Sequence, residues 1–273
     1  MTAQSCIFRD VLVVPPAGEQ PFAGWVAVAD ATIAAVGRGS PEPRADQRVI
    51  EGDGAALLPG FVNTHAHSHS SLTRGSAEGL PLERWLAVIE KEQARLALIA
   101  AAGAHVAHCP HANLKLGSGI APVPDLCRRG VNVTLGTDGA KANNRLDMLD
   151  VMKFASLLHK GVSGDPTVLP PAHVLDMATA RGAAALGVPA GAIAPGLKAD
   201  LVLVRLDGFH LQPCVPETLV TNLVHAARGS DVSLVMVDGR IVVKDGRLAD
   251  SRWADLLERV RPVARELLRV GSE

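Results

Sequence analysis

Two apolar segments with polar C-terminal ends constrain the fold of this chain more than any other feature. They are AALLPGFVNTH near the start of the chain and VNVTLGTDG near its middle. Continuous apolar runs are typical of parallel strands buried on both faces, and such strands carry functional residues at their carboxyl ends. We therefore predict the α/β fold class, with buried parallel strands over 57–64 and 131–137. A shorter strand is predicted over 104–109, in the segment GAHVAHCP.

The two ends of the chain are rich in β-branched residues and differ in this from the middle. Segments 5–14 and 25–36 are rich in Val and Ile and are bounded by Gly and Pro, which is typical of strands. Near the C-terminus, ADLVLVRL and SLVMVDGRIVVKDG are further strands, and Asp238-Gly239 predicts a hairpin turn. We expect both ends, 1–58 and 195–250, to pair into one composite β-sandwich.

The segments between these ends, and the last one, show apolar residues at helical spacing, bounded by caps and glycines. The predicted helices are 81–102 ending at Gly103, 145–160 between Asn144 and Gly161, 172–186 ending at Gly187, and a closing amphipathic helix within 251–273.

Composition and charge exclude several classes of function. The 27 basic residues are balanced by 28 acidic ones, and no basic run could form a phosphate-binding face, so nucleic acid is not an expected partner. The sequence has no apolar run of the ~18 residues that span a bilayer. The four cysteines lie far apart without a C-x-x-C pair, which argues against disulfides and thiolate zinc sites. We expect a cytoplasmic protein that binds neither membranes nor nucleic acids.

The strongest chemical signal is the pair His65 and His67 in FVNTHAH. In a strand, residues i and i+2 face the same side, so the two imidazoles can chelate one cation, and imidazole suits zinc and iron. Asp138, in LGTDG, places a carboxylate at the tip of a second buried strand, where it can bind a metal and accept a proton from metal-bound water. Each pattern alone has a plainer interpretation, namely polar histidines at a strand end and an Asp-Gly turn.

Taken together and in order, the motifs resemble the amidohydrolase superfamily. They are PGFVNTHAH, SSLTRG, CPHANLKLGSGIAPV, LGTDGAKANN, GAAALG and LKADLVLV, and the resemblance runs from residue 5 to 248. The nearest branch is the methylthioadenosine/S-adenosylhomocysteine deaminase and triazine chlorohydrolase-like group. The resemblance implies a (β/α)8 barrel flanked by a β-sandwich, and one divalent metal, zinc or iron with zinc preferred. It also implies hydrolysis of a C–N or C–Cl bond of a purine, pyrimidine or triazine type of heterocycle.

The resemblance also implies roles for individual residues. His65 and His67 match the first-strand metal ligands, and Asp138 matches the last-strand ligand and proton acceptor. Trp85 matches a position that lines the pocket mouth, and Asn113 matches a polar position near the substrate. The chain departs from the family at Ala112, where the family commonly has Ser.

The length of the middle segment conflicts with a complete barrel. Residues 59–194 offer about half of the ~250 residues that a (β/α)8 barrel needs. By family order the three predicted strands match the first, seventh and eighth, so we expect a partial barrel over 59–194 that lacks the central units. The family's fifth-strand His, its nearby Glu and the sixth-strand His would lie in the missing part.

Two questions stay open at this point. His108 is a candidate for a substrate contact or a further ligand, although a polar residue at a strand end is the favoured interpretation. The chain is either a metal-dependent hydrolase, or a catalytically inactive remnant or scaffold that assembles with itself, or a shortened version of a longer enzyme. Unpaired strand edges of an open barrel recruit partners, so a homo-oligomer is expected.

Overall fold

The computed structural model describes residues 5–41, 43, 47–66, 99–250 and 253–270 of the 273-residue chain. Its contacts divide the chain into two compact units. The first comprises Met1–Val62 and Pro170–Asp250, and the second comprises Asn63–Leu169 and Ser251–Glu273.

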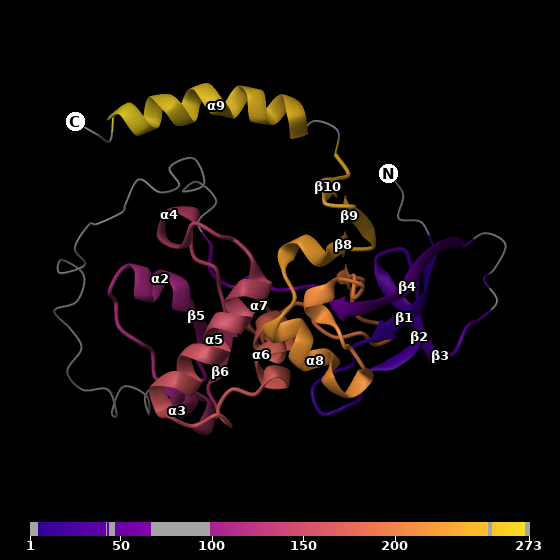
Figure 1. Cartoon of the computed structure of the whole chain (residues 1–273), viewed down its shortest axis with the longest axis horizontal. Helices are drawn as coiled ribbons and strands as arrows, with labels where there is room; N and C mark the ends of the chain where they lie inside the picture. Colours follow the sequence, from indigo (N-terminus) through magenta and orange to yellow (C-terminus); the bar gives the residue numbers. More distant parts are fainter. Residues whose placement is uncertain (1–4, 42, 44–46, 67–98, 251–252, 271–273) are drawn as a thin grey trace. The chain divides into compact units, whose positions relative to one another are not determined.

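The first unit is built on one eight-stranded mixed sheet (Figure 1). The strand order is β10-β9-β8-β7-β4-β1-β2-β3, and all neighbouring strands are antiparallel except β1 and β4, which are parallel. The strands are β1 (Cys6–Val13), β2 (Phe22–Ala29), β3 (Thr32–Arg38), β4 (Arg48–Pro59), β7 (Leu201–Val204), β8 (Val232–Val237), β9 (Arg240–Lys244) and β10 (Arg247–Leu248).

Pairing between β4 and β7 joins the two ends of the chain into this sheet. Leu57 lies opposite Leu203 in the antiparallel register. Alternate side chains of the strands form one apolar cluster, which includes the fully buried Phe8, Val26 and Leu201. The predicted α/β class is confirmed, and the β-rich ends lie in one mixed sheet; the sandwich and the partial barrel remain predictions.

The predicted hairpin turn at Asp238-Gly239 is confirmed, because it connects β8 to β9. Both residues have positive φ angles, 50° and 74°, as a two-residue turn of this kind requires. Asp30 lies in the turn between β2 and β3. A Cβ on Gly239 would lie 1.9 Å from the carbonyl oxygen of Asp30, so the close approach of these two turns also requires glycine.

The predicted helix over 172–186 consists of two helices, α6 (Pro171–Ala178) and α7 (Ala180–Leu186). The break occurs at Thr179, whose φ and ψ of −128° and −93° are not helical, and its hydroxyl donates to the carbonyl of Leu175. The predicted end at Gly187 is confirmed by its left-handed φ of 65°. This unit also contains α8 (Pro216–His225) and the short 3-10 helices η3 (Phe209–Leu211) and η4 (Gly229–Asp231).

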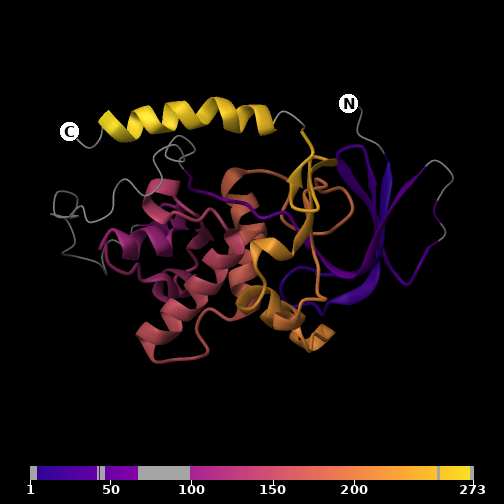
Figure 2. The ribbon, with the colours of Figure 1, turned by 45° about the horizontal axis from the view of Figure 1, so that its top comes forward.

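The second unit consists of two short parallel strands and the helices that pack on them, and Figure 2 shows those helices from a second direction. The strands β5 (His105–His108) and β6 (Asn132–Leu135) confirm those predicted over 104–109 and 131–137. Helices α3 and α5 contact β6, and α2 contacts α4 and α5. The helices are α2 (Pro110–Lys115), α3 (Val123–Arg128), α4 (Ala140–Asn143), α5 (Met148–Ser163) and α9 (Trp253–Val270).

The helix predicted over 145–160 starts and ends later than expected. Asp147 rather than Asn144 caps α5, because its carboxylate accepts from the backbone N–H of Leu149 at 3.0 Å. Asn144 instead ends α4 with a φ of 66°, and α5 continues past Gly161 to a left-handed cap at Gly164. The segment after Cys109 begins with α2, which has Pro110 in its first turn.

The strand predicted over 57–64 is also corrected, because β4 ends at Pro59 and residues 60–66 form no regular strand. His67, Trp85 and most of the helix predicted over 81–102 lie outside the described residues. Within the described ranges, no helix is both long and apolar enough to cross a membrane.

Candidate metal centre

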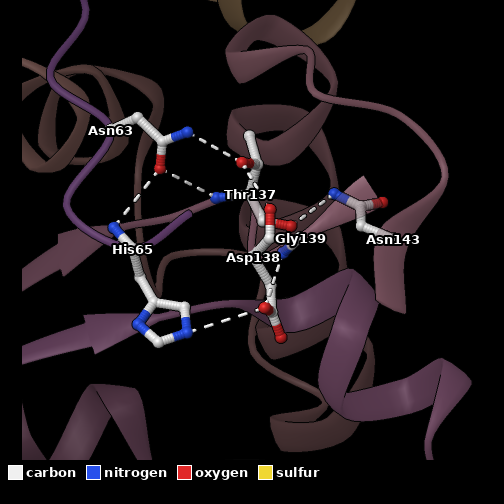
Figure 3. A network of polar contacts seen from close by, with 6 residues as sticks. All are labelled: Asn63, His65, Thr137, Asp138, Gly139 and Asn143. Atoms are coloured by element: carbon white, nitrogen blue, oxygen red, sulfur yellow. Dashed lines mark hydrogen bonds and ion pairs between the residues drawn. The ribbon is translucent and has the colours of Figure 1, made fainter. Parts of the chain in front are cut away.

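His65 and Asp138 converge in the second unit although 73 positions of sequence separate them. The Nε2 atom of His65 lies 3.6 Å from Oδ1 of Asp138. Figure 3 shows the imidazole pointing toward the carboxylate. The His65 side chain is 45% exposed and that of Asp138 18%, so a ligand can reach both.

Backbone hydrogen bonds bring the two segments together. The N–H of Thr64 donates to the carbonyl of Leu135 at 3.2 Å, and the N–H of Asp138 donates to the carbonyl of His65 at 2.9 Å. The irregular segment after β4 therefore runs alongside the end of β6 and holds His65 beside Asp138.

Side-chain bonds reinforce this contact (Figure 3). The Asn63 amide donates from Nδ2 to the hydroxyl of Thr137 at 2.7 Å, and its Oδ1 accepts from the N–H of Thr137 at 3.1 Å. Asn143 donates to the carbonyl of Thr137 at 2.8 Å. Thr137, buried and directly before Asp138, is thus bonded from two sides.

The conformation of Asp138 is set by the turn in which it lies. Its φ of 59° is in the left-handed region, which Asp tolerates better than most residues. The N–H of Gly139 donates to Oδ1 of Asp138 at 2.6 Å, which orients the carboxylate.

Gly136 permits the close approach of the two segments. A Cβ at this position would lie 2.8 Å from Cβ of His65 and 2.9 Å from Sγ of Cys109. Cys109 is buried, and burial together with the negative charge of Asp138 raises the pKa of its thiol to about 12. The Cys109 thiol is therefore neutral near pH 7. No side chain larger than hydrogen fits at Gly136.

His108 and His105 point to opposite faces of β5, as their spacing predicts. His105 is exposed, whereas His108 is 2% exposed and its Nε2 lies 3.1 Å from Nε2 of His159 on α5. Burial, and secondarily the proximity of His159, lower the pKa of His108 to about 3. His108 is therefore neutral near pH 7, and the contact that the structure gives it is with His159 on α5.

The other predicted positions lie on α2 or outside the described residues. Asn113 is on α2 and partly buried, and its backbone N–H donates to the carbonyl of Cys109. His111 is on the same helix; its ring stacks on Phe154 at 4.2 Å and its Nε2 lies 3.4 Å from a carboxylate oxygen of Asp150. Burial lowers the pKa of His111.

Two residues that the structure places around the site, Asn63 and Thr137, were missed in the sequence, and so was the contact of His159 with His108. Asn63 and Thr137 lie inside the motifs FVNTHAH and LGTDG, so their positions next to the predicted ligands were the available signal. His159 gave no signal, because its pairing with His108 depends on how α5 packs on the strands.

His65 and Asp138 fit a zinc-type ion as two of its ligands. Two donor atoms on a tetrahedral zinc are about 3.4 Å apart when each bond is 2.0–2.2 Å long, close to the observed 3.6 Å. An imidazole nitrogen and a carboxylate oxygen are both ordinary zinc donors. Among the described residues, no group of three His, Cys, Asp or Glu side chains could hold a metal ion. A complete site therefore needs donors beyond this pair.

Comparison with known proteins places this geometry in a family context. Residues 94–242 match the amidohydrolase family. A 5-methylthioadenosine/S-adenosylhomocysteine deaminase from Moorella thermoacetica is 47% identical over 171 residues, which are 60% of this chain and 40% of that protein. A 5'-deoxyadenosine deaminase from Methanosarcina mazei is 45% identical over 171 residues, covering 62% of this chain and 39% of that protein.

Solved structures share the fold. An adenosine deaminase from Xanthomonas campestris with bound zinc aligns with a TM-score of 0.87 and 23% identity, over 97% of this chain and 99% of that chain. An atrazine chlorohydrolase from Arthrobacter aurescens complexed with zinc aligns with a TM-score of 0.80 and 15% identity, over 96% and 100%. At such low identity the likeness concerns the fold. The chain spans about two fifths of the length of the curated relatives it matches.

Proposed function

Because the chain belongs to the amidohydrolase family, we propose that it carries the first-strand and last-strand ligands of a metal-dependent hydrolase. The reaction is hydrolysis of a C–N or C–Cl bond on a nitrogen heterocycle. The observation that carries the proposal is the convergence of His65 Nε2 and Asp138 Oδ1 at 3.6 Å. His67, Trp85 and Asn113 keep the roles that the resemblance implies, and His108 stays a candidate for a substrate contact although its Nε2 faces His159.

In this proposal each side chain has a defined task. A zinc or iron ion bound at the site supplies an acidic water as the nucleophile. His65 and His67 offer imidazole nitrogens to the ion, and Asp138 offers one carboxylate oxygen to it and accepts a proton. The Gly139 N–H on Oδ1 orients that carboxylate.

The proposed substrate is a 6-aminopurine nucleoside. Two of the relatives with more than 40% identity are named as deaminases of 5-methylthioadenosine, S-adenosylhomocysteine or 5'-deoxyadenosine. Pyrimidines and triazines are the other heterocycles that the motifs allow. We also propose a cytoplasmic location.

The proposed architecture follows from the same family context. Strands β5 and β6 are the seventh and eighth strands of a partial barrel over 59–194, and 1–58 with 195–250 form the composite sandwich, followed by the helix within 251–273. In the part of the chain that the structure describes, no third strand pairs with the outer edges of β5 and β6, although Thr64 bonds to the end of the β6 edge. A homo-oligomer in which another subunit completes the barrel accounts for those edges.

A second candidate is a catalytically inactive remnant or a self-assembling scaffold. It is favoured by the absence, within the described ranges, of a group of three metal-binding side chains. The two candidates differ in metal content, because only the hydrolase requires a bound ion.

The experiment that tests the proposal is metal analysis of the full chain purified with zinc. We expect near-stoichiometric zinc in the wild type, and loss of binding in His65→Ala and Asp138→Ala. His105→Ala is the matched control, because His105 is an exposed histidine of the same unit. Fewer than about 0.1 zinc per chain, with no loss of folding stability on chelation, would reject the hydrolase. Ammonia release from 5-methylthioadenosine then tests the substrate class.

A further inference from the structure

One amide side chain connects the segments that carry the two proposed ligands. Asn63 Oδ1 accepts from the N–H of His65 at 3.3 Å and from the N–H of Thr137 at 3.1 Å. Its Nδ2 donates to the hydroxyl of Thr137 at 2.7 Å. The two bonds to Thr137 cross 74 positions of sequence, and Figure 3 shows the amide between the two segments.

These bonds determine which way the amide faces. Its oxygen meets two N–H donors, and its nitrogen meets a hydroxyl that donates onward to the carbonyl of Asp138 at 3.0 Å. Reversing the amide would set its NH2 group against both N–H donors. The amide therefore has one favoured orientation, which links the backbone of His65 to the backbone of Asp138.

We infer that Asn63 is a positioning residue that sets the spacing of His65 and Asp138 for metal binding. This inference rests on the proposed function, because it assigns a role to Asn63 only if the two ligands share an ion. Asn63 acts through the backbone of both ligands and need not touch the ion. Hydrogen-bonding partners of this kind change metal affinity by about 10- to 100-fold when they are removed.

Thr64, the next residue, provides a matched control. Its hydroxyl lies 2.8 Å from the hydroxyl of Thr134 and donates to the carbonyl of Leu135 at 2.9 Å. These bonds tie the same segment to β6 but end before the turn that carries Asp138. Removing them weakens the contact between the segments without removing the link to the ligand backbone.

The experiment compares Asn63→Ala, Asn63→Asp and Thr64→Val in the full chain with Co2+ as a spectroscopic probe. Co2+ affinity is measured by titration, and the visible absorption spectrum reports ligand geometry. Thermal unfolding without metal measures any general loss of stability.

We expect Asn63→Ala to weaken Co2+ binding by about 10- to 100-fold and to change the spectrum. Asn63→Asp keeps an acceptor of the same shape for both N–H groups. Its spectrum should therefore be closer to that of the wild type than the spectrum of Asn63→Ala is. Thr64→Val should lower the unfolding temperature but keep wild-type affinity within about threefold and an unchanged spectrum. If Asn63→Ala does not fold, Thr137→Val removes the Nδ2 bond from the other side together with the onward bond to the carbonyl of Asp138, and should change the spectrum in the same direction but by less.

Two negative results are distinguishable. If the wild type binds Co2+, and Asn63→Ala binds it with the same affinity and spectrum or changes only as much as Thr64→Val, the positioning role is wrong and the metal site stands. If the wild type binds neither Co2+ nor zinc, the proposed function fails and the positioning role fails with it.

Discussion

Both units bury apolar side chains, but they differ in how many polar side chains they bury with them. The core of the sheet unit is apolar, with Phe8, Val26 and Leu57 fully buried. Most of the buried polar residues among those described lie in the second unit instead: His108, Thr134, Thr137, Ser156 and His159. Apolar burial is non-directional, whereas hydrogen bonds fix distances and angles. The sheet unit is therefore built for stability, and the second unit is built to hold side chains in place.

The largest expected effect tests the apolar core of the sheet unit. Phe8→Ala should lower the free energy of unfolding by about 3–5 kcal/mol, because it removes a fully buried aromatic ring and leaves a cavity. Phe209→Ala is the control in the same unit, since Phe209 is 94% exposed, and should change stability by less than about 0.5 kcal/mol. Urea denaturation measures both. Equal effects would show that this core does not dominate the stability of the unit.

The second prediction tests the buried polar groups by pH. His108 has a pKa of about 3 when folded and about 6.5 when unfolded, so below pH 6.5 only the unfolded chain takes up its proton. Stability is therefore retained above pH 6.5 and should fall as the pH drops, by about 2–3 kcal/mol at pH 4.5.

Urea denaturation at pH 7 and pH 4.5 measures this loss. His108→Gln, whose amide can replace the bond to His159, should reduce the difference between the two pH values. His105→Gln, on the exposed face of the same strand, should leave it unchanged. An identical pH profile in His108→Gln would contradict the assignment.

The third prediction concerns the close approach at Gly136. Gly136→Ala should destabilise the chain by about 1–3 kcal/mol and abolish metal binding, because the new methyl group displaces His65 from Asp138. Gly161→Ala in α5 is the control, since a Cβ there meets nothing within 4 Å; it should keep metal binding and gain up to about 1 kcal/mol. Retained zinc binding in Gly136→Ala would mean that the segments can separate without loss of the site.

The smallest expected effect compares one ion pair from each unit. Arg181 Nε lies 2.9 Å from Asp176 in the sheet unit, and Arg145 lies 3.5 Å from Asp150 in the second. Both pairs are partly exposed, so Arg181→Ala and Arg145→Ala should each cost less than about 1 kcal/mol, less still at high salt. Urea denaturation at two salt concentrations checks this. If either variant lowered the free energy of unfolding by more than about 2 kcal/mol, that ion pair would contribute more to stability than a partly exposed pair is expected to.

Local signals in the sequence were sufficient where short-range chemistry determines the structure. Residues that tolerate a positive φ angle predicted the turn at Asp238-Gly239 and the helix end at Gly187. Apolar runs predicted the strands β5 and β6. Competing caps misled the prediction elsewhere, since Asp147 and Asn144 both suit a helix start and only Asp147 bonds Leu149.

The candidate site was predictable only in part. The motifs marked His65 and Asp138, whose side chains the structure brings to 3.6 Å. The link through Asn63 and the pair of His108 with His159 depend on contacts across 74 and 51 positions, which periodicity does not encode. The segment around His65 was expected as a strand, but β4 ends at Pro59.

The pairing of β4 with β7 closes a loop that contains the whole segment from residue 63 to 169. The entropy of closing such a loop grows only logarithmically, by about 0.6 kcal/mol for each doubling of its length. A segment twice as long or half as long would therefore leave the register of the sheet almost unaffected in free energy. The sheet can therefore accommodate inserted segments of very different length between β4 and β7.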